Sequence, residues 1–321
     1  MTEPVAEKIL DSLYRVVVPL PRNPLKEVNC YVLAEDDRWL VIDTGMNRPE
    51  CREVLTAGLD EIGVDLEQTD FLATHLHADH HGLIPELLQP GRTASMGAID
   101  AASMGRAHGG WSEDSPMGVY LRRSGFPPEE LAESFRRHPG ARFSGQMIEY
   151  APLSEGDVIE IAGYRHTFGH ISLYDRAKRL FIAGDHILGD ITPNIQAWAD
   201  DHDPLGLYLA SIAKVEVLDV DLCLPGHRSL IHDFQGRCRE LREHHETRGR
   251  EVVDILRDNG GRNAYETAAL MTWDIRAKSW DDFPIMQRWF ATGEAIAHLR
   301  WLEDLGELQR EDAGERIRYS A

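Results

Sequence analysis

The sequence is poor in cysteine, in basic residues and in long apolar runs. Its four cysteines, Cys30, Cys51, Cys223 and Cys238, are scattered without a C-x-x-C pair, so neither a disulfide framework nor a thiolate metal site is indicated. No stretch approaches the ~20 apolar residues that span a bilayer, and residues 1–10 lack the apolar core of a signal peptide. We therefore expect a cytoplasmic protein with no membrane segment.

The charge is strongly acidic. The chain has 54 acidic and 34 basic residues, which gives a formal net charge of −20. A field of that sign repels phosphate backbones, so nucleic acid is not expected as a partner unless a local basic surface overcomes it. The 321 residues, 42% of them hydrophobic, suffice for one large core and a small second domain.

The densest group of candidate ligands is the run His75-Leu76-His77-Ala78-Asp79-His80, which follows an apolar stretch. Imidazole and carboxylate groups are ligands that zinc, iron or manganese accept. The alternative is a solvated polar loop. The spacing argues against that alternative, because alternate residues can converge on one ion while Asp79 and His80 turn toward a second. The run therefore predicts a metal-binding loop.

Three later residues supply what such a loop lacks. His170, Asp185 and His227 each close an apolar or β-prone run, and a glycine precedes each of them. Glycine lets the backbone turn sharply and come close to an ion. Four strand ends therefore offer seven candidate ligands to one edge of a sheet.

This pattern resembles the metallo-β-lactamase superfamily, in which a His-x-His-x-Asp-His loop is followed by a His, an Asp and a His on later strand ends. The resemblance covers about residues 12–235. It implies an α/β fold, namely a four-layer αββα sandwich. By resemblance, one metal would be held by His75, His77 and His170, and the other by Asp79, His80 and His227, with Asp185 bridging. Asp43, in the run 41–45, would brace the loop without binding metal.

The ligand set implies a dinuclear hydrolase. Two metals about 3.5–4 Å apart can bridge a water and lower its pKa toward ~7, which gives a hydroxide nucleophile. Asp79 and Asp185 would hold the metals and orient that hydroxide. Zinc is the first choice because three imidazoles suit it, while iron and manganese are also compatible. A flavin-linked diiron reductase is disfavoured, because position 77 is His where such relatives carry Glu, and the tail is short.

Apolar periodicity predicts the elements around these ligands. Strands are expected at 13–19, 30–34, 39–43, 158–161, 164–167, 180–183 and 220–224, and helices at 50–62 and 83–88. Residues 1–240 would form the catalytic domain, with a mostly helical insertion at 97–145 that folds over the metals as a lid. The pairs Arg122-Arg123 and Arg136-Arg137 lie in this insertion. They are either solvated helix faces or a cradle for an anionic substrate.

Residues 241–321 form a predicted second domain. Helical spacing occurs at 251–257 and 264–272, and a longer amphipathic helix at 285–305 precedes a short β wing. The order resembles the small winged-helix domain at the C-terminus of one branch of lactamase-like hydrolases. Acidic residues on the long helix argue against DNA binding. Tryptophans 273, 280, 289 and 301 would form either the core of this domain or a homo-oligomer interface.

The favoured substrate is a thioester or another small acyl compound, as in glyoxalase II-like members. The enzymatic alternative is a phosphodiesterase or ribonuclease, because winged-helix relatives include nucleases. The non-enzymatic alternative is a metal-bearing sensor or interaction module. Asn194 and Trp198 follow the bridging Asp185 closely and are candidate substrate contacts, although an aromatic residue beside a metal site is as easily part of the core.

Overall fold

The computed structural model describes residues 4–106, 112–159, 164–165 and 170–321. These residues form a mixed α/β protein with two compact units. Unit 1 is drawn from residues 1–108, 139–193 and 218–237, and unit 2 from residues 109–138, 194–217 and 238–321. The predicted insertion is helical but is divided between the two units. The domain boundary predicted near residue 240 stays a prediction.

In the described residues, the larger sheet of unit 1 has seven strands in chain order. They are β1 (Ala6–Leu10), β2 (Leu13–Pro19), β3 (Glu27–Glu35), β4 (Arg38–Ile42), β5 (Thr69–Leu72), β6 (Ala94–Gly97) and β7 (Ala151–Leu153). Strands β1 to β4 pair antiparallel, and β4 to β7 pair parallel. Because parallel strands end at the same edge, the residues that follow β4 and β5 lie close together.

The second sheet of unit 1 has the order β12-β11-β10-β9-β8 among the described residues. Its strands are β8 (Val158–Ile159), β9 (Tyr164–Arg165), β10 (Leu173–Asp175), β11 (Leu180–Gly184) and β12 (Leu222–Pro225). Among the strands that the structure describes here, only β11 and β12 are parallel, so they too deliver their following residues to one edge. The predicted strands 158–161 and 164–167 fall partly outside the described residues.

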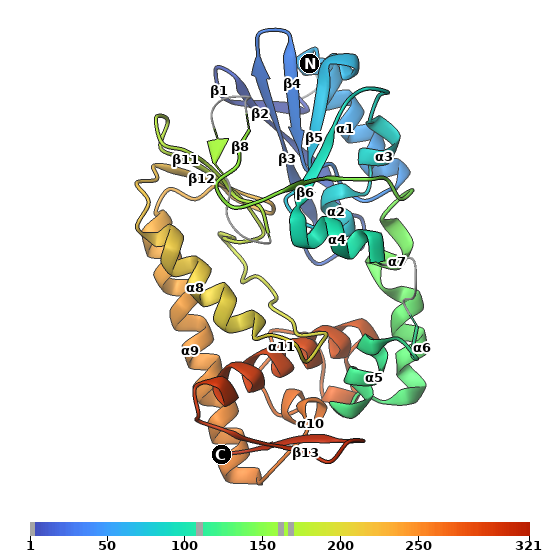
Figure 1. Ribbon diagram of the computed structural model, residues 1–321, viewed down its shortest axis with the longest axis vertical. Helices are drawn as coiled ribbons and strands as arrows, with labels where there is room; N and C mark the ends of the chain where they lie inside the picture. The colour runs from blue at the N-terminus through green and yellow to red at the C-terminus, as the bar shows by residue number, and fades with distance from the viewer. Residues whose placement is uncertain (1–3, 107–111, 160–163, 166–169) are drawn as a thin grey trace. The chain divides into compact units, whose positions relative to one another are not determined.

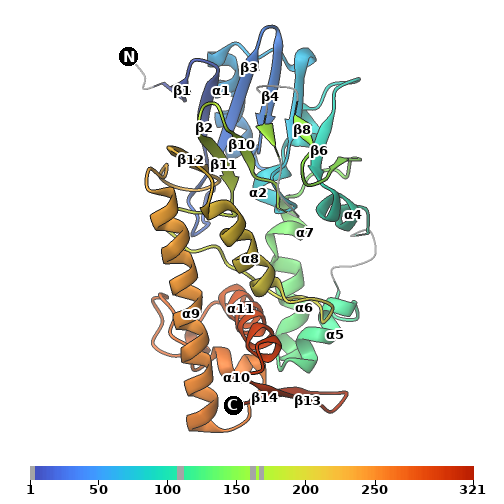
Figure 2. The same ribbon diagram turned by 60° about the vertical axis from the view of Figure 1, so that its left-hand side comes forward.

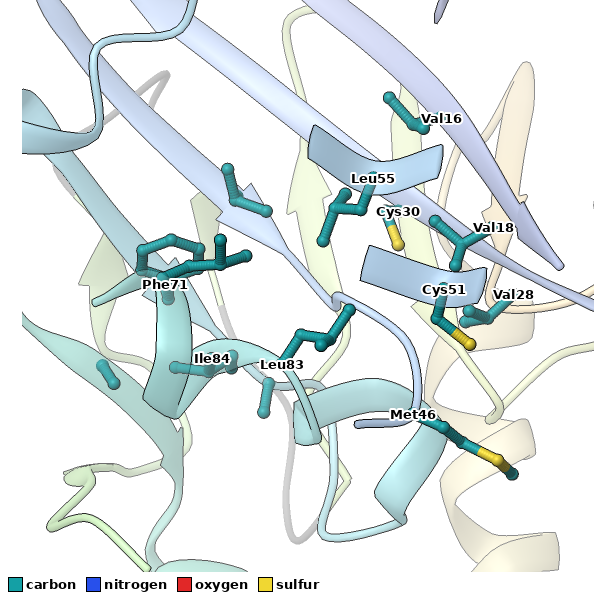
Figure 3. Close-up of a cluster of buried hydrophobic side chains, with 14 of the residues drawn as sticks. Val16, Val18, Val28, Cys30, Met46, Cys51, Leu55, Phe71, Leu83 and Ile84 are labelled. Carbon is teal, nitrogen blue, oxygen red and sulfur yellow. The ribbon is translucent and has the colours of Figure 1, made fainter. Parts of the chain in front are cut away.

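Two apolar layers hold unit 1 together. Helices α1 (Pro49–Ile62) and α3 (Ile84–Leu87) cover one face of the larger sheet (Figure 1). Between helices and sheet, Val16, Val18, Val28 and Cys30 meet Cys51 and Leu55 of α1 (Figure 3). The helix comes close because Gly58 faces Val16, where an added Cβ would lie 2.7 Å from a valine methyl group.

The other face of the larger sheet packs against the second sheet. Leu33 and Ile42 belong to the same buried cluster as Leu173, Ile182 and Leu224. On the opposite face of the second sheet, Phe181 packs against Phe234, with ring centroids 5.1 Å apart. Phe234 begins helix α9 (Phe234–Asn259). Helix, sheet, sheet and helix follow one another, as the predicted sandwich requires.

The shorter helices and the elements of unit 2 complete the chain. Unit 1 also has η1 (Leu66–Gln68), α2 (Ala78–His81), α4 (Ala98–Arg106) and α7 (Pro139–Phe143). Unit 2 contains α5 (Pro116–Arg123), α6 (Pro128–Arg137), α8 (Pro204–Glu216), most of α9, α10 (Ala264–Ala268), η3 (Trp280–Asp282), α11 (Ile285–Asp304) and the hairpin β13 (Gln309–Asp312) to β14 (Ile317–Ser320). No helix among the described residues is both long and apolar enough to cross a bilayer.

Helix α11 is the centre of unit 2, with α8 and α6 packed against it (Figure 2). The expectation of one apolar side is wrong, because buried residues occur all around the helix. Small residues at 291, 293, 295 and 297 let neighbouring segments approach. Trp289 is fully buried, so this tryptophan belongs to the core of the unit.

The C-terminal region departs from one expectation and matches another. The helix expected at 251–257 is the end of α9, which begins at Phe234, so the predicted domain start at residue 241 falls inside a continuous helix. The β wing is present as the antiparallel pair β13–β14. The winged-helix likeness stays a prediction.

Candidate metal centre

The predicted metal loop lies between strand β5 and helix α2. After β5 the chain passes Thr74 and His75, and His77 is the N-cap residue of α2. This short helix turns Asp79 and His80 inward, where their exposed fractions are 6% and 0%. His77 stays exposed at the rim. The loop thus has a buried side and a solvent side.

Asp43 braces the buried side of this loop. It follows β4 in a left-handed conformation with φ of 60°. Its Oδ1 accepts the Thr74 N–H at 2.8 Å, and its Oδ2 accepts the Thr74 hydroxyl at 2.9 Å and the His80 Nδ1–H at 2.8 Å. A carboxylate on Nδ1 fixes the imidazole tautomer and leaves Nε2 free to bind a metal. The bracing role expected for Asp43 is confirmed.

The second sheet delivers Asp185 and His227 after glycines that have no room for a side chain. At Gly184, with φ of 52°, an added Cβ would lie 2.4 Å from His170 Cε1. At Gly226 it would lie 2.6 Å from Asp185 Oδ1. The expected close approach therefore holds at both positions. Gly169, which precedes His170, lies outside the described residues.

His227 is oriented from strand β3. Its Nδ1 donates to the carbonyl oxygen of Glu27 at 2.6 Å. Close by, the carbonyl of Pro225 accepts from Tyr31 Oη at 2.7 Å and from Asn29 Nδ2 at 2.9 Å. These bonds fix both the ring and the strand end that carries it. His227 therefore presents Nε2 to the interior of the site.

In the part of the chain that the structure describes, two groups of side chains offer converging ligand atoms, and Asp185 lies between the imidazoles. One group is Asp79, His80 and His227, and the other is His75, His80 and Asp185. Asp185 Oδ1 lies 3.3 Å from His227 Nε2 and 3.5 Å from His80 Nε2, while its Oδ2 lies 3.8 Å from His75 Nε2. The two oxygens of one carboxylate thus face different histidines, as a bridging ligand would require.

His77 and His170 are near but are not part of either group. His77 Nδ1 lies 2.8 Å from His75 Nε2. The ring of His170 stacks on that of His75 with centroids 4.5 Å apart, while its Nε2 accepts the Asp185 N–H at 2.8 Å. The structure brings these two residues to the site without joining them to His75 as three converging ligands. The predicted assignment of each ligand to one of the two metals stays a prediction.

The electrostatics differ among the site's histidines. Against the effect of burial, Asp43 and Asp185 raise the pKa of His80, and Asp185 raises that of His227, so a metal would displace protons from these two rings. Burial lowers the pKa of His75, and it lowers the pKa of His170 to about 3, so both rings keep the neutral form that donates a lone pair. Burial opposes ionisation of Asp185, but nearby His227 and His80 hold its pKa well below the usual range. Asp185 is therefore a carboxylate at neutral pH.

The donor atoms fit a metal by a second criterion. Four buried atoms of the site have no hydrogen-bond partner among the described residues: His80 Nε2, His170 Nδ1, His227 Nε2 and Asp185 Oδ1. An unsatisfied buried polar atom costs about 1–3 kcal/mol. The two Nε2 atoms of His80 and His227 lie 3.5 Å and 3.3 Å from Asp185 Oδ1. A divalent cation would satisfy these three atoms together.

Other predicted contacts lie in unit 2. Trp198 packs on Trp289 with ring centroids 5.1 Å apart, and an added Cβ on Gly293 would lie 2.7 Å from its ring. Asn194 is exposed. Trp198 therefore has a packing role within this unit, and its role as a substrate contact stays a prediction.

The four arginines for which an anion cradle was one of two interpretations have protein partners. Arg123 pairs with Asp312, Arg136 and Arg137 both pair with Glu133, and Arg122 donates to the carbonyl of Glu113. The interpretation as ordinary surface charges is the better supported one.

Sequence reasoning missed several residues that support the site. Thr74, Tyr31 and the carbonyl of Glu27 all act within it, yet none belongs to a residue pattern typical of metal sites. The contacts of Tyr31 and Glu27 span 194 and 200 residues, so only the folded chain reveals them.

Comparisons with known proteins agree with this geometry. The profile of the metallo-β-lactamase superfamily matches residues 24–227, and that of the metallo-β-lactamase-like C-terminal domain matches residues 281–321. A metallo-β-lactamase family protein from Thermus thermophilus is 26% identical with a TM-score of 0.78, covering 98% of this chain and 99% of its own. A β-lactamase domain protein from Burkholderia ambifaria is also 26% identical, with a TM-score of 0.82 and coverages of 98% and 94%.

Curated relatives are more distant. The lactamase-like protein adaB of Aspergillus niger is 23% identical over 79% of this chain and 66% of its own length. An atrochrysone carboxyl ACP thioesterase of Emericella nidulans is 23% identical over 70% of this chain and 58% of its own length. The match thus spans about two-thirds or less of these two relatives. From the superfamily profile, which covers most of the chain, together with the fold and the ligand set, this protein belongs to the metallo-β-lactamase superfamily.

Proposed function

We propose that this protein is a dinuclear metal-dependent hydrolase that acts on a thioester or another small acyl compound. The observation that carries the proposal is the convergence of unpartnered His80, His227 and Asp185 atoms in one buried site. Members of the superfamily are generally hydrolases. Two divalent ions, zinc by preference and iron or manganese as alternatives, would supply an acidified water and Lewis-acid polarisation of the substrate oxygen.

The chain's own residues have separable roles in this proposal. Asp185 would hold both ions, because its two oxygens face different histidines. Asp79 Oδ2, 3.7 Å from His227 Nε2, would complete one ion's ligands. His77, exposed at the rim, would close the other ion's ligand set on the solvent side. His170 would be a further metal ligand, bound through one nitrogen of its ring.

A cysteine nucleophile does not compete with this mechanism. All four cysteines are buried with 0% exposure. Burial raises the pKa of Cys30 well above its usual value and also raises that of Cys51. Buried thiols in apolar surroundings are inert. Water activated at the metal site is the nucleophile that we propose instead.

The thioester preference draws on the relatives and on charge. Two relatives carry the name atrochrysone carboxyl ACP thioesterase, at 22–23% identity. The net charge of −20 disfavours a long polyanionic substrate such as RNA. Small acyl compounds are therefore the proposed substrates, and a cytoplasmic location and self-association through the C-terminal domain stay predictions.

The test compares two substrates in one zinc-loaded preparation. We expect a higher kcat/KM for a short acyl-coenzyme A thioester than for bis(p-nitrophenyl) phosphate. His80→Ala should lower the thioester rate at least about 100-fold, since losing a supporting partner of a ligand already costs 10–100-fold. The matched control is His202→Ala, which removes an exposed histidine of unit 2. A phosphodiester preference, or equal loss in both variants, would overturn the proposal.

A further inference from the structure

Asp100 makes an unexpected long-range contact with the metal loop. It lies in the first turn of α4, within the predicted insertion. Its Oδ2 accepts the backbone N–H of Leu76 at 3.0 Å, from 24 residues away. That amide lies between His75 and His77, two candidate ligands. A carboxylate of the insertion therefore holds the peptide that joins two metal-binding side chains.

The contact completes the support of the loop. On the buried side, Asp43 binds Thr74 and His80. Neither of these bonds restrains the rim side, where His77 is exposed. A bond to the Leu76 N–H limits rotation of the backbone on both sides of that amide and so limits where the His75 and His77 rings can go. Asp43 and Asp100 therefore support the buried side and the exposed side of the same metal loop.

Asp100 lies where its surroundings disfavour the charged form of its carboxyl group. Burial raises the pKa of its carboxyl to about 6, against the Leu76 hydrogen bond, which lowers it. No salt bridge to Asp100 occurs among the described residues, so the Leu76 amide is the partner that the structure assigns to it. A half-buried carboxylate thus contacts the backbone between two candidate metal ligands.

We infer that Asp100 is a positioning residue that holds the His75–His77 segment in its metal-binding conformation and thereby couples helix α4 to metal occupancy. This inference rests on the proposed metal site but not on the identity of the substrate. Coupling is reciprocal, so metal binding must in turn stabilise the Asp100–Leu76 bond. Helix α4 should then exchange its amide protons more slowly in the metal-loaded protein.

The test measures zinc affinity of the full chain by competition with a chromophoric chelator at pH 8. Asp100→Ala should weaken zinc binding about 10–100-fold, the usual cost of removing a group that orients ligands. Asp100→Asn should restore most of the affinity, because its Oδ1 still accepts the Leu76 N–H. The matched control is Ile99→Ala, which changes the neighbouring exposed residue and should leave affinity unchanged.

A second measurement does not depend on any variant folding. Hydrogen–deuterium exchange of the wild-type chain, with and without zinc, should show slower exchange at Leu76 and in α4 when zinc is present. Unchanged exchange there, or an Asp100→Ala protein with wild-type zinc affinity, overturns the inference. If zinc binding depends on Asp100 while neither thioester nor phosphodiester is hydrolysed, the proposed function fails and this inference stands.

Discussion

Replacing Asp43 by Asn changes the proton arrangement of the site with almost no change in shape. In the native site one oxygen accepts the Thr74 N–H, and the other accepts from the Thr74 hydroxyl and from His80 Nδ1–H. The amide NH₂ can only donate. Placed opposite His80, it forces that ring to carry its proton on Nε2, and a protonated Nε2 has no lone pair for a metal.

The amide can face either way, and each orientation has its own cost in metal affinity or in folding free energy. Groups that orient metal-binding histidines are worth about 10–100-fold in metal affinity, which corresponds to about 1.4–2.7 kcal/mol. If the amide turns around instead, its NH₂ faces the Thr74 N–H and leaves a buried donor unsatisfied, at a cost of about 1–3 kcal/mol in folding free energy. One orientation therefore replaces the native bonds from His80 and from the Thr74 hydroxyl, and the other loses the bond from the Thr74 N–H.

Zinc affinity by chelator competition, together with urea unfolding of the metal-free protein, separates the two outcomes. Asp70→Asn is the matched control, because Asp70 lies on the adjacent strand β5 and accepts the Thr93 N–H at 2.8 Å through one oxygen, a bond that Asn can keep. Wild-type zinc affinity in Asp43→Asn, or the same loss in Asp70→Asn, would refute the reasoning about the His80 tautomer.

Three further outcomes are expected. Gly226→Ala should abolish binding of at least one metal equivalent, because the added Cβ would lie 2.6 Å from Asp185 Oδ1. The control is Gly63→Ala, whose added Cβ would have no atom within 4 Å. Elemental analysis should find both metal equivalents in this control. Chelation should lower the melting temperature, because a ligand at 100 times its Kd stabilises by about 2.7 kcal/mol, and an unchanged melting curve would count against a metal site. Gly293→Ala should destabilise unit 2 by about 1–3 kcal/mol, measured by denaturant unfolding, because its Cβ would lie 2.7 Å from Trp198; unchanged stability would show that the ring can move aside.

The sequence made the candidate ligands predictable because imidazole and carboxylate groups carry their chemistry in their identity. Asp79, His80, Asp185 and His227 lie together in the structure. The glycines before Asp185 and His227 were also predictable, since a close backbone approach excludes a Cβ. Strand β2 and helix α1 followed from apolar periodicity nearly to the residue.

Backbone partners could not be predicted in the same way. The carbonyl of Glu27 that orients His227 has no signature in the residue type, and neither does the Leu76 amide that Asp100 holds. The prediction for helix α11 was wrong because its large apolar residues favour one side, while the small residues between them are buried too. Periodicity reports large side chains and cannot show where small ones let a neighbour approach.

Titrating the metal-free protein with zinc while measuring thioester turnover tests the central claim most directly. Activity should rise with added zinc and level off at about two equivalents per chain, the number that a bridged site holds. Turnover that persists in the metal-free protein would contradict the proposed mechanism, as would turnover that never appears at any zinc level while zinc binds.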